Sequence, residues 1–169
     1  MILVDATTLY ELGQVGELEL LDAFEGTVVV LDAVAAEVDV EPAATNLDRF
    51  LDEYEVSTTV SGLSEFEDDA MALLDADERT SDVALVAALL AGRDRAETTA
   101  LVSGDKRLRA IADGLGATVT STFGVVVRAT ADDKYFSTTQ AKRVLRRTDH
   151  HGVQMTGTLR ERAIGEVSD

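Results

Sequence analysis

Short apolar runs alternate along the chain with segments in which apolar residues return every three or four positions. The runs are continuous and rich in β-branched residues, which is typical of buried strands. They occupy residues 2–5, 27–31, 55–60, 100–103 and 117–120. The segments between them have the spacing of helices that bury one face. Gly13 and Gly16 interrupt the first of these segments, so we expect a broken helix there.

This alternation predicts one α/β domain, a three-layer α/β/α sandwich whose mostly parallel central sheet has about five strands. A chain of 169 residues has the usual length of a single domain. We expect residues 1–130 to form the sandwich and residues 131–169 to add two basic helices as an extension of the same domain. Capping boxes at residues 137–140 and 158–161 predict where these two helices begin.

Acidic and basic residues are unevenly distributed. The formal net charge is −17, and only three of the 15 basic residues are lysine. Abundant carboxylates with little lysine suit a salt-rich cytosol, because salt screens the repulsion between surface charges. We therefore interpret the source as halophilic and haloarchaeal, with a basic partner as the alternative explanation. Residues 1–105 hold 25 acids and four bases, whereas residues 106–169 hold seven acids and 11 bases, so the last third is expected to bind any anion.

The chain contains no cysteine, which excludes a disulfide framework and a cysteine-based zinc site. Its first residues carry neither a basic segment nor a long apolar run, so we expect no signal peptide and no membrane span. The protein is therefore expected in the cytoplasm.

Four acidic residues stand at related places in the predicted elements. Asp5 ends the first strand, and Asp105 lies just past the fourth. Glu37 belongs to a predicted helix at 33–38, and Asp82 to the first turn of the helix that leads to the fourth strand. Each has an ordinary explanation by itself, as a helix cap or an exposed helical acid. Because ligand sites of parallel sheets lie at the carboxyl ends of the strands, their joint order predicts one acidic site.

Carboxylates that converge repel one another unless a cation lies between them. Mg²⁺ and Mn²⁺ prefer oxygen ligands and usually keep some bound water. Such an ion activates its water and neutralises the charge that develops on a phosphoryl group. A site of four carboxylates without cysteine therefore favours Mg²⁺- or Mn²⁺-dependent cleavage of phosphodiesters over zinc chemistry.

Four motifs follow one another along the chain: Ile-Leu-Val-Asp-Ala-Thr-Thr-Leu from residue 2, Thr-Val-Val-Val-Leu-Asp-Ala-Val-Ala-Ala-Glu-Val from residue 27, Ser-Asp-Val-Ala-Leu-Val-Ala-Ala-Leu from residue 81 and Leu-Val-Ser-Gly-Asp-Lys-Arg-Leu-Arg-Ala-Ile-Ala from residue 101. In this order they resemble the motifs of PIN domains. The resemblance covers residues 1–130, and the two terminal helices are similar to those of one prokaryotic subgroup. VapC-type toxins are its best-known relatives. The chain departs from the family pattern at Asp82, where Glu is usual, and at Gly104, where the subgroup often has a further Asp.

The resemblance implies a metal-dependent endoribonuclease, a hydrolase that cleaves RNA with metal-held water. Its catalytic metal ligands would be Asp5, Glu37, Asp82 and Asp105. Thr7 and Ser103 would contact these ligands or the metal-bound water. The residues implied in binding substrate phosphates are Lys106, Arg107, Arg109, Arg143 and Arg146. By analogy with the toxins, an antitoxin protein would neutralise the enzyme, and the enzyme would be a homodimer.

Two other functions remain open at this point. A phosphatase of the haloacid-dehalogenase type is the first, because Val-Ser-Gly-Asp-Lys from residue 102 resembles the Gly-Asp turn of that family. That chemistry needs a second acid two residues after the first, where this chain has Thr7. The second is a catalytically inactive PIN fold that binds RNA or a protein. An acyl phosphate trapped on Asp5 would indicate the phosphatase, and metal binding without cleavage would indicate the inactive fold.

Overall fold

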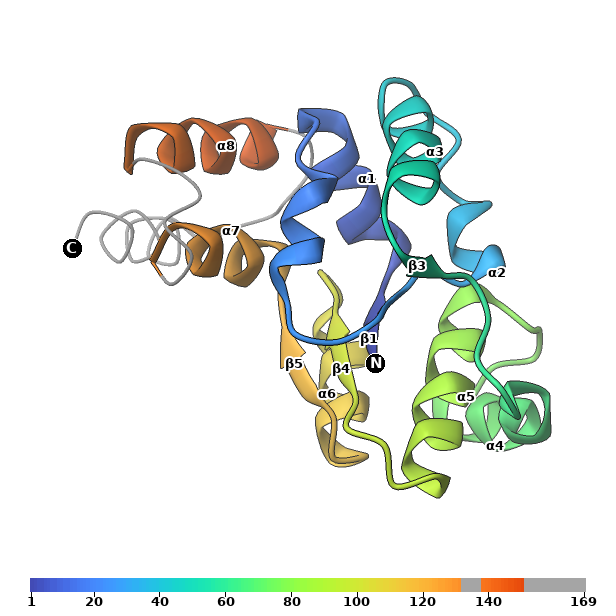
Figure 1. The fold of residues 1–169 in the computed structure, drawn as a ribbon. Coiled ribbons are helices and arrows are strands. Elements are labelled where there is room, and N and C mark those ends of the chain that lie inside the picture. Colours follow the sequence, from blue (N-terminus) through green and yellow to red (C-terminus); the bar gives the residue numbers. More distant parts are fainter. Residues whose placement is uncertain (132–137, 151–169) are drawn as a thin grey trace.

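Five short parallel strands form the middle layer of the protein (Figure 1). The computed structural model describes residues 1–131 and 138–150. The strands lie in the order β3-β2-β1-β4-β5. They are β1 (Ile2–Val4), β2 (Val28–Val29), β3 (Val56–Ser57), β4 (Ala100–Val102) and β5 (Thr118–Thr120). Each lies inside an apolar run that predicted a strand, so the predicted parallel sheet is confirmed.

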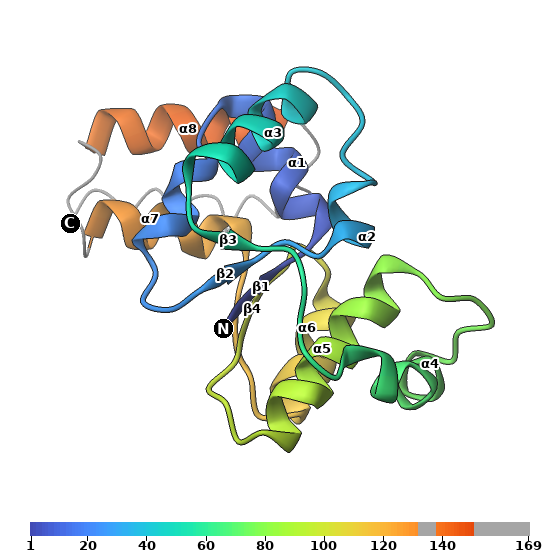
Figure 2. The same ribbon diagram turned by 45° about the vertical axis from the view of Figure 1, so that its right-hand side comes forward.

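Helices cover both faces of this sheet, as Figure 2 shows. One layer consists of α1 (Ala6–Val15), the 3-10 helix η1 (Leu18–Ala23), α3 (Ala43–Glu53), α7 (Thr122–Ala131) and α8 (Thr138–His150). The other layer consists of the 3-10 helix η2 (Leu63–Phe66), α4 (Glu67–Leu74), α5 (Ser81–Asp94) and α6 (Lys106–Gly114). The short helix α2 (Asp32–Ala35) contacts α1 and α5, which belong to opposite layers. The predicted α/β/α sandwich is therefore confirmed.

The core lies on both sides of the central strands. Leu3 and Leu101 are completely buried, because strands with helices on both faces have no solvent side. Helix α5 is buried around most of its circumference, since it packs against α4 and η2 as well as α6. This explains why its sequence is apolar nearly throughout, without the one-sided stripe of a surface helix.

The first of the two predicted C-terminal helices is α8, which packs against α7 and α1. It begins at Thr138, inside the predicted capping box at 137–140. The second predicted helix, expected from residue 158, lies outside the described residues.

The predicted break in the first helical segment is confirmed at Gly16, but Gly13 lies inside α1 and does not interrupt it, so that part of the prediction was wrong. Helix α3 crosses α1 at this point, and a Cβ on Gly13 would stand 3.0 Å from the backbone Cα of Ala43. The carbonyl of Gly13 also accepts a hydrogen bond of 2.8 Å from Nδ2 of Asn46. Helix α1 is capped at its end by Gly16, whose φ of 73° favours glycine. The absence of a side chain at Gly13 thus serves the contact between two helices.

Replacing Gly13 with alanine is expected to destabilise the protein by about 1–3 kcal/mol, although alanine is the better helix former. The added methyl group would have to displace backbone atoms of Ala43, which a packed helix resists. Gly114→Ala is the matched control, because a Cβ at that helical position meets no atom within 4 Å. Denaturant unfolding in concentrated KCl measures both changes. Equal stability of the two variants would contradict the tight crossing of α1 and α3.

Candidate active site

The sheet extends in opposite directions from the boundary between β1 and β4: β2 and β3 lie beyond β1 on one side, and β5 lies beyond β4 on the other. From β1 the chain enters α1 in one helical layer, and from β4 it enters α6 in the other. The two connections therefore diverge at the carboxyl ends of neighbouring strands, where parallel α/β sheets place their ligand sites. Asp5 follows β1 and Asp105 follows β4, so these two predicted acids lie at this point of the fold.

Asp5 is held by three hydrogen bonds. Its Oδ1 accepts from the backbone N–H of Thr8 at 2.8 Å, which caps α1. Its Oδ2 accepts from Oγ of Ser103 at 2.5 Å and from the N–H of Gly104 at 3.1 Å. Only 4% of the residue is exposed. A carboxylate so enclosed is poorly placed to attack a phosphorus atom, which disfavours the phosphatase.

Ser103 connects the two acids of this pair. Its hydroxyl donates to Asp5 and accepts a hydrogen bond of 3.0 Å from the N–H of Asp105. The residue is completely buried, so this geometry is protected from competing water. Asp105 in turn caps α6, because its Oδ1 accepts from the N–H groups of Arg107 and Leu108. Ser103 therefore sets the relative position of the two acidic turns.

Asp82 lies in the first turn of α5, and its pKa depends on the charges of all three other predicted acids. The residue is exposed, but nearby protein atoms remove part of the hydration of its carboxylate, and this raises its pKa above the ordinary value. Negative charges raise the pKa further, in the order Asp105, Asp5, Glu37. The cation of Arg107 acts in the opposite direction. Four acids from separate segments thus share one electrostatic field.

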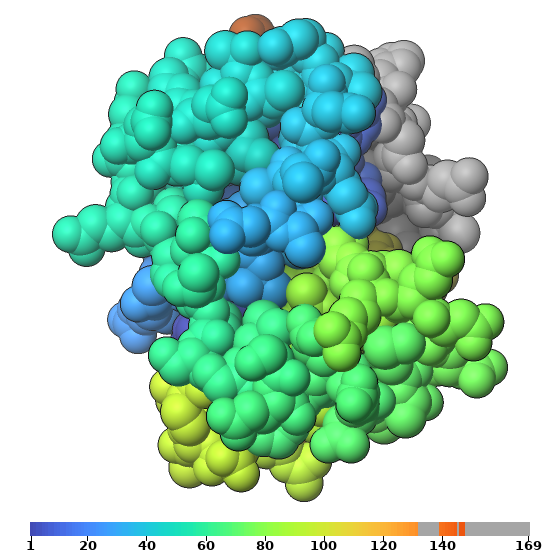
Figure 3. All heavy atoms as spheres, turned by 90° about the vertical axis from the view of Figure 1, so that its right-hand side faces the viewer, coloured from blue at the N-terminus to red at the C-terminus, as the bar shows by residue number. Residues whose placement is uncertain are grey.

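Glu37 contributes to the electrostatic field at Asp82, but its position in the fold differs from the predicted one. The helix predicted through residue 38 ends at Ala35, and Glu37 lies in the turn that follows. Its N–H donates to the carbonyl of Val34 at 3.2 Å. The two residues are three apart, as in a 3-10 turn, which is tighter than an α-helix. In Figure 3, α2 lies between α3 and the layer of α4 and α5. Its contact with α5 explains how the exposed Glu37 acts on Asp82.

Thr7 is exposed in the first turn of α1, beside Gly104. A Cβ on Gly104 would stand 3.2 Å from the methyl group of Thr7. The structure therefore brings Thr7 to the turn between β4 and α6, as expected for a residue next to the acids. The same contact explains why Gly104 and Thr7 suit each other, since a larger residue at 104 would press on the threonine.

These side chains suit a hydrated divalent cation. Within residues 1–131 and 138–150, no three acids are gathered closely enough to ligate an ion directly. Mg²⁺ and Mn²⁺ commonly bind through one or two carboxylates and retain several waters, so wider spacing is compatible with them. The donors are all carboxylate and hydroxyl oxygens, and Asp5 keeps a lone pair beyond its three hydrogen bonds. The mutual repulsion at Asp82 is what a cation would relieve.

The basic residues after β4 take part in building the turn. Nη2 of Arg107 donates to the carbonyl of Leu74 at 2.6 Å, which ties α6 to the end of α4. Nη1 of Arg109 donates to the carbonyl of Ser103 at 2.6 Å. Lys106 is exposed in the first turn of α6. Two of the three predicted phosphate contacts on α6 therefore also stabilise the backbone around the acids.

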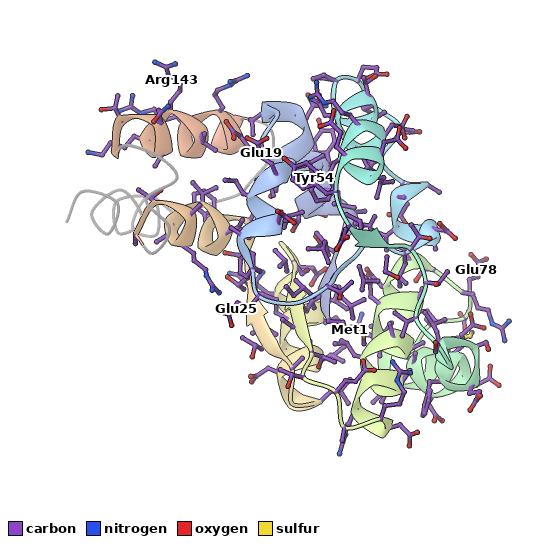
Figure 4. The ribbon with its side chains drawn as sticks, viewed as in Figure 1. Met1, Glu19, Glu25, Tyr54, Glu78 and Arg143 are labelled. Atoms are coloured by element: carbon purple, nitrogen blue, oxygen red, sulfur yellow. The ribbon has the colours of Figure 1, made fainter. Side chains whose placement is uncertain are left out.

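The basic residues of α8 lie in the opposite helical layer from those of α6. Arg143 and Arg146 are exposed. Figure 4 shows Arg143 pointing away from the body of the protein. The structure therefore does not join the two basic groups into one cluster.

Glu11 is a buried acid that the sequence interpretation missed. It is 3% exposed, and its Oε2 accepts a hydrogen bond of 2.5 Å from Oγ1 of Thr122. Burial raises its pKa to about 7, the hydrogen bond from Thr122 lowers it, and the charge of Asp5 raises it. The available signal was that Thr8, Glu11 and Val15 share one face of α1, so two polar residues stand on a face that must be buried. That signal identifies a polar contact but does not name its partner.

In the part of the chain that the structure describes, no helix is long and apolar enough to cross a membrane.

Comparison with known proteins agrees with this geometry. A family model described as a PIN domain matches residues 1–169. No curated protein and no solved structure matches the chain. PIN domains are generally nucleases, and they typically use divalent metal ions. Because the match extends over the whole chain and the fold is the one expected, the chain belongs to the PIN domain family.

Proposed function

We propose that this protein is a Mg²⁺- or Mn²⁺-dependent endoribonuclease that hydrolyses RNA phosphodiester bonds at the carboxyl edge of its sheet. The observation that carries the proposal is the state of Asp82, whose pKa is raised by its surroundings and by the charges of Asp105, Asp5 and Glu37. Uncompensated repulsion of this kind costs stability, so stability alone does not account for the cluster. A reaction that needs a divalent cation does.

The four acids would hold the ion, some of them through its bound waters, and its chemistry is to activate a water molecule and to neutralise charge on the phosphoryl group. The chain's own contribution is position. Ser103 and Gly104 hold Asp5 in one orientation, and the N-terminus of α6 holds Asp105. Because the pKa of Asp82 is raised, this residue is neutralised earlier on acidification than an isolated aspartate. Binding of the ion is therefore expected to weaken as the pH falls.

Bases at the start of α6 support a polyanionic substrate. Lys106 and Arg107 occupy the first turn of the helix, where the helix dipole is unfavourable for positive charge. The helix dipole therefore does not explain Lys106, whereas binding of phosphate does, and Arg107 lies beside it while also tying α6 to Leu74. Arg109 adds to this group. Arg143 and Arg146 of α8 are exposed in the other helical layer, so any phosphate contact that they make would be separate from the one at α6.

The biological setting we propose is that of a toxin in a toxin–antitoxin pair, acting as a homodimer in a salt-rich cytoplasm. Its support is the resemblance to VapC-type toxins together with a net charge of −17 and very few lysines. High salt weakens phosphate contacts that depend on release of counterions. Such an enzyme would depend more on its metal ion and its direct hydrogen bonds.

The test is cleavage of a mixed, structured RNA in concentrated KCl with Mg²⁺, with Mn²⁺ and with EDTA. Wild-type protein is expected to cleave only with metal, and Asp82→Asn is expected to cleave at least ~10-fold more slowly, because it removes one charge from the metal site. Asp94→Asn is the matched control, since Asp94 is exposed on the same helix about 18 Å further along its axis. Cleavage that persists in EDTA, or equal rates for wild type and Asp82→Asn, would refute the proposal.

A further inference from the structure

Three polar side chains form a buried cluster between α1 and the start of α7. Thr8 is completely buried, Thr122 is 1% exposed and Glu11 is 3% exposed. Oγ1 of Thr122 lies 2.5 Å from Oε2 of Glu11 and 3.2 Å from Oγ1 of Thr8. The three residues therefore form one hydrogen-bonded chain in the interior.

This chain ends next to Asp5. The backbone N–H of Thr8 donates to Oδ1 of Asp5 at 2.8 Å, so the residue that contacts Thr122 through its side chain contacts Asp5 through its backbone. The charge of Asp5 also acts on Glu11 directly. Glu11 is thus connected to the acidic site both by hydrogen bonds and by electrostatics, although it does not touch any of the four proposed ligands.

Thr122 makes the direction of the hydrogen bonds depend on Glu11. A hydroxyl group has one hydrogen to donate. When Glu11 is ionised, that hydrogen is required by its carboxylate, and Thr8 must donate to Thr122. When Glu11 is protonated, it can donate to Thr122, whose hydrogen is then released towards Thr8. The state of Glu11 is therefore communicated to the first turn of α1.

A carboxylic acid at this position is costly to bury and unnecessary for packing. An apolar residue or glutamine would occupy the space without an ionisable group. Among the described residues on the elements packed against α1, the other charged side chains are exposed or half-buried, as for Glu19 of η1, Asp32 of α2, Asp48 of α3, Arg128 of α7 and Lys142 of α8. None of these explains why an acid is kept inside, so its relation to Asp5 is the remaining physical reason.

We propose that Glu11 is a positioning residue of the acidic site. Through Thr122 and Thr8 it fixes the conformation of the first turn of α1, which holds Asp5, and its ionisation increases the affinity of the site for a divalent cation. The part that concerns the cation rests on the proposed function. Burial places the pKa of Glu11 at about 7, so the residue changes its charge between pH 6 and 8. Above that range it adds a negative charge behind Asp5, and below it the charge is absent.

The first arm of the test needs neither metal nor substrate. The backbone amide groups of Thr8 and Gly104 both donate to Asp5, and their resonances are followed by NMR as the pH is raised from about 5.5 to about 8.5. Wild-type protein is expected to show an inflection near pH 7 at Thr8 that is absent in Glu11→Gln and reduced in Thr122→Val. Asp48→Asn, an exposed acid on α3, should behave as wild type. No inflection in the wild type, or the same inflection in Glu11→Gln, would overturn the proposal.

The second arm measures Mn²⁺ affinity by calorimetry in concentrated KCl at about pH 6 and about pH 8, which lie on either side of the pKa of Glu11. Wild-type affinity is expected to rise between these values by up to about 10-fold more than that of Glu11→Gln, because one charge is gained near the ion only in the wild type. Asp48→Asn should again follow the wild type. An equal rise in wild type and Glu11→Gln would overturn the cation part of the proposal.

The two arms also separate this proposal from the proposed function. If the amides report Glu11 but the wild type binds no Mn²⁺, the positioning role stands, and both the cation part and the nuclease are overturned. If Mn²⁺ binds and the amide resonance of Thr8 does not depend on Glu11, the proposed nuclease function stands and the positioning role is overturned.

Discussion

Asp5→Asn is expected to lose metal-dependent RNA cleavage and also part of its stability. The rate should fall by more than about 100-fold, because removing even an outer partner of a metal ligand costs 10–100-fold. Stability should fall by about 1–3 kcal/mol, since the asparagine amide offers one acceptor oxygen where the carboxylate serves three donors. Whichever way the amide is turned, its NH₂ group faces an N–H or O–H group inside the protein.

Two measurements separate these effects. Cleavage is measured at a temperature where denaturant unfolding shows that the variant is fully folded. Asp82→Asn serves for comparison, because Asp82 is exposed and its replacement is expected to slow cleavage with little loss of stability. If Asp5→Asn cleaved RNA at the wild-type rate while folded, Asp5 would have no part in the reaction and the site would have to lie elsewhere.

Glu11→Gln is expected to stabilise the protein at pH 8 and to leave its stability nearly unchanged at pH 5. The pKa of Glu11 is about 7 in the folded protein and 4.5 as the ordinary value, so the folded state binds more protons between these values. The stability that comes from the protonated group is fully present below pH 4.5 and is lost as the pH rises through 7. The full loss corresponds to roughly 3 kcal/mol, which is an upper bound for the gain in the variant because a buried amide must also find partners.

Denaturant unfolding of the wild type and Glu11→Gln at these two pH values measures the difference, and the contributions of the other acids cancel in it. A constant difference between the two proteins across this range would show that Glu11 does not titrate in the folded state. The expected result has a functional side. Under the proposed function, a substitution that increases stability at pH 8 would at the same time weaken the proposed metal site, a trade-off typical of residues kept for activity.

The lengths of the strands illustrate a limit of sequence patterns. The run at residues 55–60 predicted a strand, and β3 occupies only Val56–Ser57. β3 is an edge strand that pairs with β2 alone. An apolar run indicates that a segment will be buried, but a strand exists only where a neighbour supplies hydrogen bonds. β2 itself is limited to Val28–Val29 for the same reason, since its two neighbours overlap only there.

The convergence of the acids could be predicted in part, because three of them, Asp5, Asp82 and Asp105, follow a recognisable strand or begin a recognisable helix. Asp5 and Asp105 follow β1 and β4, and parallel strands place their carboxyl ends together. Glu37 was predicted in the site but on a longer helix, because the sequence does not reveal that α2 ends at Ala35. The intermediate role of Ser103 as a bridge between two acids was only partly foreseen, since its burial depends on strands that meet in the sheet.

Residue order along the chain was enough to establish the α/β class, the parallel sheet and the acidic edge, because periodicity and strand ends are local properties. Packing was needed for the rest. Gly13 is needed inside a helix because α3 crosses it there, and Glu11 has a raised pKa because packing buries it beside Thr122, which is 111 residues away in the chain. Burial and electrostatic coupling depend on distances in space between residues that are far apart in the chain, and no local pattern contains those distances.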